Sequence, residues 1–497
     1  MLDRRFFLAG LAAVAGRAAL AEAPASSPVP PSRPMAPSPG RTASSGLRPR
    51  GPDPEDLIAA AGLGGDVTYV LADAATGERL EARGPDRPMP PASTLKAVTS
   101  LYALEHLGAG FRFPTRILRT GPLEGGTLGG DLILAGGGDP TLTTDHLGDL
   151  AAALRKAGLR RVSGRFRVWG GALPFVRAID PGQPDWFGYN PSVSGLILNF
   201  NRVNFVWKRG GAEVAMNAEG ERFVPAVHAA RMRVVDRAGP LYTWEDGGVT
   251  EDWTVRAAAL ARDGSRWLPV RQPERYAGDV FRTLAATQGI DLPDVDVASA
   301  LPAGAVTLVA RQSDELPVIL RDMMKYSTNV TAEAVGMAAS LRRGVTSHAG
   351  SGPEMERWAK GRAGLGTCRF VDHSGLGPAS RISADEMVRA LLGLDPRARL
   401  RGLMKEVPAN EKGEAPMPGL KVEAKTGTLN FVSALVGYMT APGGREMVFA
   451  IFSGDPARRD AIPEADREQP PGAAAWTRRA RRLQRQLVTR WAVVHGG

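Results

Sequence analysis

The sequence predicts an α+β protein that carries a large, mostly β insertion. Apolar residues recur every three to four positions after residue 95 and again near the C-terminus, which is typical of helices that bury one face. Two apolar runs after residue 430 indicate an antiparallel pair of strands. Between residues 116 and 305, strand-like runs are short and are broken by glycine and proline. We therefore predict a core domain made of residues 55–115 and 306–497, with residues 116–305 inserted between its two parts.

The first 25 residues have the pattern of an export signal. Arg4 and Arg5 precede an apolar run, and small residues follow it near Ala23 and Ala25. The Arg-Arg-Phe-Phe-Leu string resembles a twin-arginine signal, so we expect export to the periplasm by that route. The apolar run is shorter than the ~20 residues that span a bilayer, which argues against a retained anchor. Residues 26–54, rich in Pro, Ser, Ala and Gly, are expected to form a flexible linker.

Composition excludes several classes of function. The chain has 497 residues, a net charge of +10 and a pI near 10.0, but its arginines are scattered and it contains no nucleic-acid-binding module. We therefore expect no nucleic-acid partner, and attraction to an acidic cell-wall polymer or membrane surface fits the charge better. The single cysteine, Cys368, excludes an internal disulfide. The six histidines never form a close pair at ligand spacing, so we predict no metal site and no cofactor.

The elements before the insertion form a hairpin and a helix. The run 66–73 is typical of a strand, and Gly77 with Glu78 turns the chain into a second short strand. Pro90 and Pro91 then stop the chain. From Leu95 onward the apolar positions share one helical face, which predicts a buried helix with Ser93 in its first turn.

The insertion is expected to contain short strands, among them 130–135 and 196–201, with helices at 145–157 and 273–289. The Gly-Gly-Gly-Asp-Pro run at 136–140 could suggest a phosphate-binding loop. Because it lacks the lysine and the following helix, a turn is predicted instead.

After the insertion, a helix at 316–325 leads to a loop that holds Ser327, and Thr331 opens another helix. Ser383 begins a capping box for a helix through Leu394. Runs 431–440 and 445–452 predict an antiparallel meander. The last helix, 476–494, has one apolar face and a basic remainder, so it could pack on the sheet or lie on a membrane surface. We expect packing, with at most peripheral membrane contact.

Ser93 and Lys96 form an S-x-x-K pattern at the start of the predicted helix. Residues three apart lie on the same side of a helix, so the amine can reach the hydroxyl. A serine hydroxyl needs a nearby base to act as a nucleophile, and a helix N-terminus favours the negative charge that develops in attack. Taken alone, the pattern also fits a helix-capping serine followed by a solvated lysine.

Two further motifs favour the nucleophile. Among nine lysines only Lys96 has a serine three residues before it, and among eight asparagines only Asn329 has a serine two residues before it, at Ser327. The only K-T-G begins at Lys425. The order S-x-x-K, S-x-N, K-T-G is the motif set of the penicillin-interacting serine enzymes. We therefore predict a serine enzyme with Ser93 as its nucleophile.

With these motifs the chain resembles the D-alanyl-D-alanine carboxypeptidase/endopeptidase group of the low-molecular-mass class C penicillin-binding proteins. These are serine peptidases with large insertions after the first motif. The resemblance covers nearly the whole chain after the export signal, although Thr328 stands where the family usually has aspartate. It implies a penicillin-binding/β-lactamase-like transpeptidase domain, in which helices and a helical subdomain flank an antiparallel sheet. Three further stretches have that family's texture: 129–132 with 138–142, 198–201 and 372–376.

The resemblance implies roles for the first two motifs. Ser93 would attack the carbonyl of the penultimate D-alanine, and Lys96 would accept its proton. For this Lys96 must be neutral, and burial beside the second cation, Lys425, is a physical route to a lowered amine pKa. Ser327 would pass a proton to the departing amine, while Asn329 positions Lys96 and the substrate amide.

The third motif is implied to bind the end of the substrate. Lys425, Thr426 and Thr428 would hold the terminal carboxylate, and Gly427 would let the peptide lie close to the strand. The backbone N–H groups of Ser93 and Thr428 would form the oxyanion hole. The implied partners are peptidoglycan stem peptides ending in D-Ala-D-Ala, with β-lactams as covalent inhibitors.

Two alternatives remain beside the peptidase. One is a cell-wall-binding protein without turnover, which the intact motifs argue against. The other is a β-lactamase. Class A β-lactamases carry an E-x-x-L-N loop between the second and third motifs, but the only asparagine there, Asn410, has Val407 three residues before it. A class C enzyme would need tyrosine at the position of Ser327, and Tyr326 is one residue away.

Overall fold

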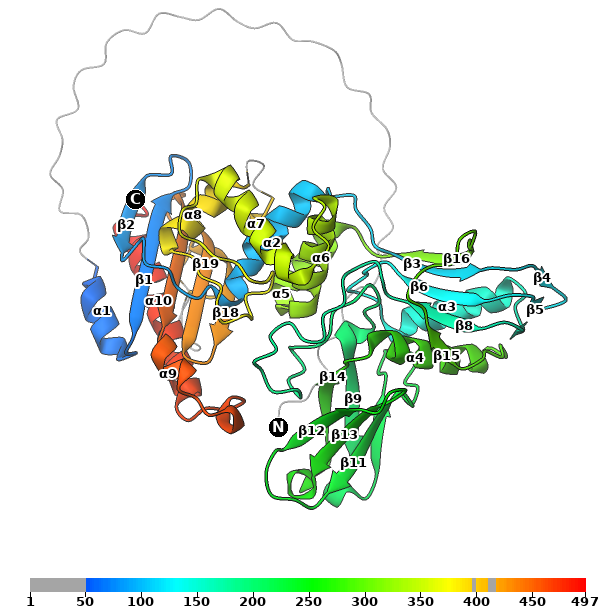
Figure 1. The fold of residues 1–497 in the computed structure, drawn as a ribbon. Helices are drawn as coiled ribbons and strands as arrows, with labels where there is room; N and C mark the ends of the chain where they lie inside the picture. The colour runs from blue at the N-terminus through cyan, green and yellow to red at the C-terminus, as the bar shows by residue number, and fades with distance from the viewer. Residues whose placement is uncertain (1–50, 396–398, 410–416) are drawn as a thin grey trace, which may run out of the picture. The chain divides into compact units, whose positions relative to one another are not determined.

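The computed structural model describes residues 51–395, 399–409 and 417–497 (Figure 1). The predicted export signal and Asn410 lie outside the described residues, as does the linker up to residue 50. In the described ranges no helix is long and apolar enough to cross a membrane. These ranges also contain no cluster of three His, Cys, Asp or Glu side chains that could hold a metal ion.

A six-stranded antiparallel sheet forms the centre of the part that contains the first and the last described residues, 51 and 497 (Figure 1). The predicted hairpin and the predicted meander both belong to it, and the meander is confirmed with a third strand, β18, in front of the two expected ones. In sheet order the strands are β17 (Lys405–Glu406), β18 (Lys421–Leu429), β19 (Val432–Thr440), β20 (Glu446–Gly454), β1 (Asp66–Asp73) and β2 (Arg79–Arg83).

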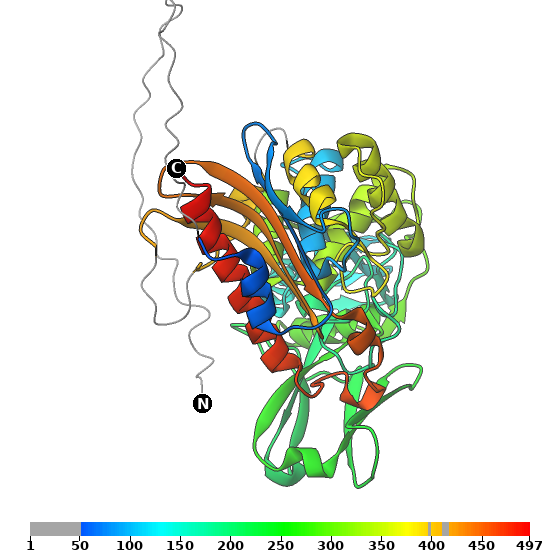
Figure 2. The same ribbon diagram turned by 90° about the vertical axis from the view of Figure 1, so that its left-hand side faces the viewer.

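One face of this sheet is covered by the last helix, α10 (Ala473–Val494), together with α1 (Pro54–Ala61), as Figure 2 shows. Trp476, Leu483 and Trp491 of α10 are completely buried against the sheet. The predicted apolar face of the last helix therefore packs on the sheet, and its arginines lie mostly on the outside. The short helix α9 (Pro456–Asp460) lies between β20 and α10.

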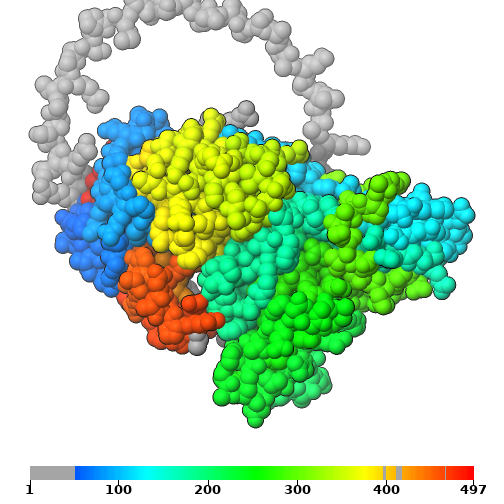
Figure 3. All heavy atoms as spheres, viewed as in Figure 1, coloured from blue at the N-terminus to red at the C-terminus, as the bar shows by residue number. Residues whose placement is uncertain are grey.

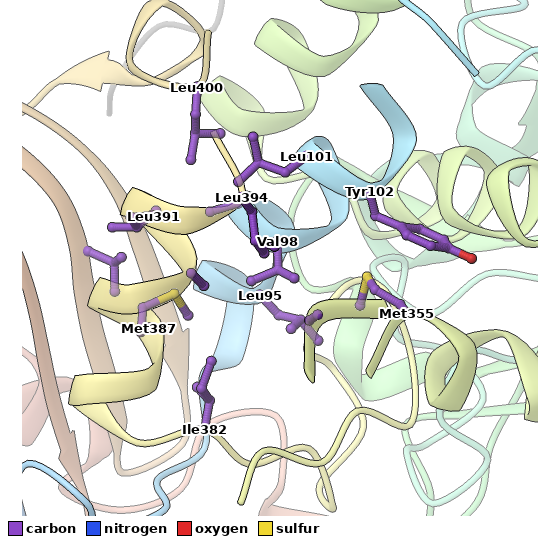
Figure 4. Packing of buried hydrophobic residues seen from close by; sticks show 14 of the residues in the cluster. Leu95, Val98, Leu101, Tyr102, Met355, Ile382, Met387, Leu391, Leu394 and Leu400 are labelled. Atoms are coloured by element: carbon purple, nitrogen blue, oxygen red, sulfur yellow. The ribbon is translucent and has the colours of Figure 1, made fainter. Parts of the chain in front are cut away.

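The opposite face of the sheet packs against a helical subdomain. Its central helix, α2 (Leu95–His106), is buried along most of its length, and Leu95, Val98 and Leu101 contribute to the core in Figure 4. The predicted capping box at Ser383 is present. The surrounding helices are α5 (Leu316–Tyr326), α6 (Asn329–Arg342), α7 (His348–Ala363) and α8 (Ala384–Gly393).

The segment between α2 and α5 is mostly β, as predicted, and belongs to the same compact unit. Its largest sheet buries one face against α3 (Thr144–Lys156) and α4 (Pro273–Thr287), close to the two predicted helices. The strands of this sheet, in order, are β15 (Val295–Val297), β8 (Phe166–Trp169), β6 (Leu132–Gly136), β3 (Pro114–Arg119) and β16 (Val306–Gln312).

Three smaller sheets complete the segment, each with its central strand between two others. They are β10 (Val214–Asn217), β9 (Arg202–Trp207) and β14 (Gly264–Pro269); β11 (Ala230–Val235), β13 (Glu251–Arg256) and β12 (Tyr242–Asp246); and β4 (Leu123–Glu124), β5 (Thr127–Leu128) and β7 (Arg161–Val162).

The predicted strand at 196–201 is wrong. The chain there is irregular and ends in a turn at Asn199–Asn201, whose three residues have φ angles of 49°, 59° and 50°. Asparagine tolerates this left-handed conformation because its side chain bonds nearby backbone groups. Here Asn201 Oδ1 accepts the N–H of Leu198 at 3.1 Å. The strand, β9, starts only at Arg202.

The glycine run at 136–140 forms the end of β6 and a turn, as predicted. Its aspartate, Asp139, is buried and accepts a hydrogen bond from Arg311 at 2.7 Å. The negative charge of a buried carboxylate would repel a phosphate, and its pairing with an arginine stabilises the turn, so the turn has a structural role.

Candidate active site

Ser93 lies in a single 3₁₀ turn, Ala92–Thr94, that runs directly into α2. The sequence predicted Ser93 in the first turn of the helix itself. In the structure it lies in the short turn that precedes the helix. The preceding residue, Ala92, has a φ of 46°, which is unfavourable for a residue with a Cβ. Such conformations persist only where the surroundings impose them, and they concentrate at functional sites.

The Lys96 amine lies between three oxygen atoms, although its side chain is completely buried. Its Nζ is 2.9 Å from Ser93 Oγ, 2.8 Å from Asn329 Oδ1 and 2.8 Å from the carbonyl oxygen of Ser374. The carbonyl and the amide oxygen can only accept hydrogen bonds. A neutral amine has two N–H groups for these two acceptors, and its lone pair then faces the Ser93 hydroxyl.

The pKa of Lys96 is lowered to about 7 by burial. The negative charges of Asp372 and Glu333 act in the other direction and limit the shift. Burial was expected to lower this pKa, and it is the cause here. The charge of Lys425 does not contribute to this shift. Instead, burial and then the charge of Lys96 lower the pKa of Lys425. A neutral Lys96 is therefore available near pH 7.

Ser327 and Asn329 reach the site from two consecutive helices. Ser327 ends α5 in the left-handed conformation, with a φ of 60°. The next helix, α6, begins at Asn329, two residues before the expected start, and Thr328 precedes it in an extended conformation. The Asn329 amide donates through Nδ2 to the carbonyl oxygen of Tyr189 at 2.9 Å. This bond fixes the amide so that Oδ1 faces Lys96.

Lys425, in β18, lies next to the second motif. Its buried Nζ donates to Ser327 Oγ at 2.9 Å and to the carbonyl oxygen of Thr426 at 2.9 Å. Burial, with help from the charge of Lys96, holds its pKa well below the ordinary value for lysine. The structure thus arranges five predicted site residues in two sets of hydrogen bonds. Lys96 contacts Ser93 and Asn329, and Lys425 contacts Ser327.

Gly427 brings β18 against the turn that holds Ser93. A Cβ at this position would lie 2.9 Å from the carbonyl oxygen of Pro91 and 3.1 Å from the backbone nitrogen of Ser93, so only glycine fits without displacement. Thr426 is partly buried and Thr428 is exposed at the end of the strand. The third motif therefore runs alongside the nucleophile.

Two buried carboxylates support the loop that follows α7, and the sequence did not single them out. Glu333 of α6 accepts the backbone N–H of Ser374 at 2.9 Å. Asp372 accepts the N–H groups of Gly375 and Gly377. Both carboxylates hold the backbone whose Ser374 carbonyl receives the Lys96 amine. The only signal in the sequence was the family-like stretch 372–376.

Glu333 also pairs with His348, whose Nε2 lies 3.0 Å from Glu333 Oε2. Burial alone would raise the pKa of this glutamate, but the hydrogen bond and charge of His348 lower it overall. The pKa of Asp372 is raised, by burial first and by the charge of Glu333 second. Glu333 therefore keeps its negative charge to a lower pH than Asp372 does.

A cavity of about 1210 Å³ opens in front of these groups. Ser93, Ser327, Asn329 and Thr428 line it on one side. Figure 3 shows a hollow between the orange-red segment after β20 and the teal part of the inserted segment. Residues that the sequence did not predict as site residues complete the wall, among them Asp180, Gln183, Tyr189, Arg459, Arg467 and Arg481.

Comparison with known proteins places the chain in a family. The model of the D-Ala-D-Ala carboxypeptidase 3 (S13) family matches residues 55–470. A D-alanyl-D-alanine carboxypeptidase from Actinomadura sp. (strain R39) is 29% identical over 418 residues, which are 77% of each chain. D-alanyl-D-alanine carboxypeptidase DacB of Haemophilus influenzae is 25% identical over 386 residues, covering 73% of this chain and 79% of that one.

Among solved structures, penicillin binding protein 4 of Haemophilus influenzae matches with a TM-score of 0.69 and 20% identity, over 88% of this chain and 99% of that one. This likeness confirms the predicted fold class. The two sequence comparisons and the family match extend over most of the chain and agree with one another. The protein belongs to the D-Ala-D-Ala carboxypeptidase 3 (S13) family of serine hydrolases.

Proposed function

We propose that this protein is a D-Ala-D-Ala carboxypeptidase and endopeptidase that cleaves peptidoglycan stem peptides through an acyl-enzyme on Ser93. The observation that carries this proposal is the Lys96 amine, which is 2.9 Å from Ser93 Oγ and has a pKa of about 7. A buried amine with two acceptors for its two N–H groups has a lone pair left for the serine proton.

Acylation follows from this geometry. Ser93 Oγ forms a bond to the carbonyl carbon of the penultimate D-alanine, while its proton passes to Lys96. The backbone N–H groups of Ser93 and Thr428 are proposed to bind the oxyanion, a contribution of about 3 kcal/mol per donor in comparable sites. The backbone position of Gly427 beside Ser93 supports this arrangement, because it lets the strand approach the turn.

Cleavage requires a proton on the departing amine. Ser327 is proposed to donate it and to be resupplied from Lys425, to which it is hydrogen bonded. The amine of the terminal residue then leaves, and a water molecule takes its place. The water attacks the ester carbonyl and gives one proton back to Lys425 through Ser327, while Lys96 returns its proton to Ser93 Oγ and the acyl group leaves as a carboxylic acid. We propose that Lys425, Thr426 and Thr428 bind the terminal carboxylate of the substrate during these steps.

β-Lactams are proposed to acylate the same serine. A solved structure of penicillin binding protein 4 from Haemophilus influenzae, with a TM-score of 0.68 to this chain, is a complex with a β-lactam. We also propose that the protein acts in the periplasm after export by the twin-arginine route, since its substrates are cell-wall peptides.

The test compares the wild-type protein with Ser93→Ala. The wild type should bind fluorescent penicillin covalently and release D-alanine from a peptide ending in D-Ala-D-Ala, while Ser93→Ala should do neither and keep the wild-type circular dichroism spectrum. A labelled Ser93→Ala protein would contradict the assignment of the nucleophile. A wild type that binds penicillin without releasing D-alanine would be a cell-wall-binding protein, and one that hydrolyses its adduct many times per second would be a β-lactamase.

A further inference from the structure

Arg481, on the solvent-facing side of α10, extends into the cavity at the end of the third motif. Its guanidinium donates a hydrogen bond to Thr428 Oγ1 at 3.1 Å, and both residues line the cavity that contains Ser93. The sequence offered no reason to connect this arginine with the site, because the last helix was expected to pack on the sheet with at most peripheral membrane contact. The packing of α10 on the sheet brings these two residues together, although they are far apart in the sequence.

The direction of this hydrogen bond leaves a donor available for an anion. Because Thr428 Oγ1 accepts from Arg481, the hydroxyl proton of Thr428 is available to a second partner. Arg481 has further N–H groups, and within the described part of the chain it forms no ion pair. Two donors, one of them positively charged, therefore meet at the mouth of the cavity.

Among the described residues, three carboxylates line the cavity, Asp180, Asp460 and Glu468, and two of them have hydrogen-bond partners. Glu468 accepts from Arg266 at 2.7 Å and from the Trp186 indole at 3.0 Å. Asp180 accepts the N–H of Gly182 and a hydrogen bond from Gln183. A solvated arginine gains little from a single neutral hydrogen bond, and it loses side-chain entropy when it is held in one place. The geometry therefore favours an anionic ligand at Arg481.

We propose that Arg481 binds the carboxylate on the leaving-group residue of the substrate, together with Thr428, and so determines the preference for peptides that carry this carboxylate. This proposal rests on the proposed function of the Ser93 site. Arginine suits the task because its planar N–H groups match the two oxygens of a carboxylate. The C-terminal helix thus contributes a specificity residue to a reaction whose acylating groups all lie elsewhere.

The test measures kcat/KM for two substrates, a peptide ending in D-Ala-D-Ala with a free carboxylate and the same peptide with a C-terminal amide. Arg481→Ala should lower kcat/KM for the free acid about 10- to 100-fold, the range expected for a hydrogen-bonded charge pair, and change that for the amide less than about threefold. Arg481→Lys should have a kcat/KM for the free acid between those of the wild type and Arg481→Ala, because lysine keeps the positive charge but lacks the paired N–H donors of a guanidinium.

Arg482→Ala is the matched control, since it removes the same charge one residue further along α10 on a side chain that does not line the cavity. It should keep the preference for the acid. Acylation by a β-lactam whose carboxylate is esterified should proceed at the wild-type rate in Arg481→Ala.

The inference fails if Arg481→Ala retains the wild-type ratio of acid to amide, or if both substrates lose activity equally. It also fails if Arg482→Ala reproduces the loss. Failure of the proposed function has a different signature, because then the wild type itself releases no D-alanine from either peptide.

Discussion

The Lys96 amine is buried without an ionised partner at hydrogen-bond distance, since its three neighbours are a hydroxyl, an amide oxygen and a carbonyl oxygen. Such an environment disfavours the ammonium form, and the pKa of about 7 is the result. The charge of Glu333 and Asp372 keeps the pKa from falling further. The activity of Ser93 should therefore depend on pH through Lys96.

The first prediction concerns this dependence. Lys96 accepts the proton only when neutral, and a pKa of about 7 makes the neutral form dominant above pH 7. The second-order rate constant for acylation by penicillin should rise with pH to a plateau above about pH 8 and fall about tenfold per unit below pH 6. Stopped-flow acylation between pH 5 and 9 measures this, with circular dichroism to verify folding. A flat profile from pH 6 to 8 would exclude Lys96 as the base.

At the scale of single residues, the motif residues could be predicted from the sequence because their spacing is local and rare. The groups that surround them could not. Glu333 acts through backbone N–H groups of a distant loop, and Asp372 holds that loop from within. Arg481 reaches Thr428 only because α10 packs on the sheet that contains β18. None of these contacts leaves a periodic or spaced pattern in the chain.

At the scale of elements, α6 connects the second motif to the loop that supports Lys96. Gly336 faces that loop, and a Cβ there would overlap the ring of His373, next to Ser374. Gly361 in α7 has no atom near the place of a Cβ. Both glycines are helical, so they differ mainly in the room available to a side chain.

The second prediction uses this pair. Gly361→Ala should stabilise the protein by about 0.5–1 kcal/mol, because alanine favours the helix. Gly336→Ala should destabilise it by about 1–3 kcal/mol and slow acylation of Ser93, because the clash moves the loop that contacts Lys96. Thermal unfolding and penicillin labelling measure both effects. Equal shifts in the two variants would show that the contact with His373 does not constrain α6.

Element prediction from the sequence failed for α7 and for residues 196–201. The helix α7 contains Pro353 and several glycines, which locally oppose a helix, yet Met355 and Trp358 bury one side of it in the core. Tertiary packing decides there. At 196–201 the apolar run is typical of a strand, but the asparagine side chains stabilise a turn that apolar periodicity cannot reveal.

At the scale of the whole molecule, we propose that residues 116–305 are an insertion in a catalytic domain made of residues 55–115 and 306–497. β3 and β16 pair at the two boundaries of this segment, so its main sheet also includes the flanking residues 114–115 and 306–312. The segment also contacts the site, since Tyr189 holds Asn329 and Glu468 of the segment after β20 binds Trp186 and Arg266. The insertion therefore forms one wall of the cavity.

The third prediction tests the contact across that wall. Glu468→Ala removes both bonds and should raise the rate of trypsin cleavage at Arg458, Arg459 or Arg467 about 3- to 10-fold, because local opening becomes easier. Acylation of Ser93 should stay at the wild-type rate. Glu464→Ala is the control, because Glu464 is exposed in the same segment, and it should leave cleavage unchanged. Peptide masses identify the cut sites. Equal cleavage in both variants would show that Glu468 does not hold this segment against the insertion.

The position of β1 between β2 and β20 sets the order in which the chain can fold during synthesis. Asp73 pairs with Met447, so the strands on the two sides of β1 leave the ribosome at opposite ends of translation. All strands of the insertion's main sheet lie between residues 114 and 312, so that sheet has its partners much earlier. β18, which adjoins the turn at Ser93, joins the growing protein late. A nascent chain therefore carries the serine without its neighbours, and only the finished polypeptide assembles the reactive centre.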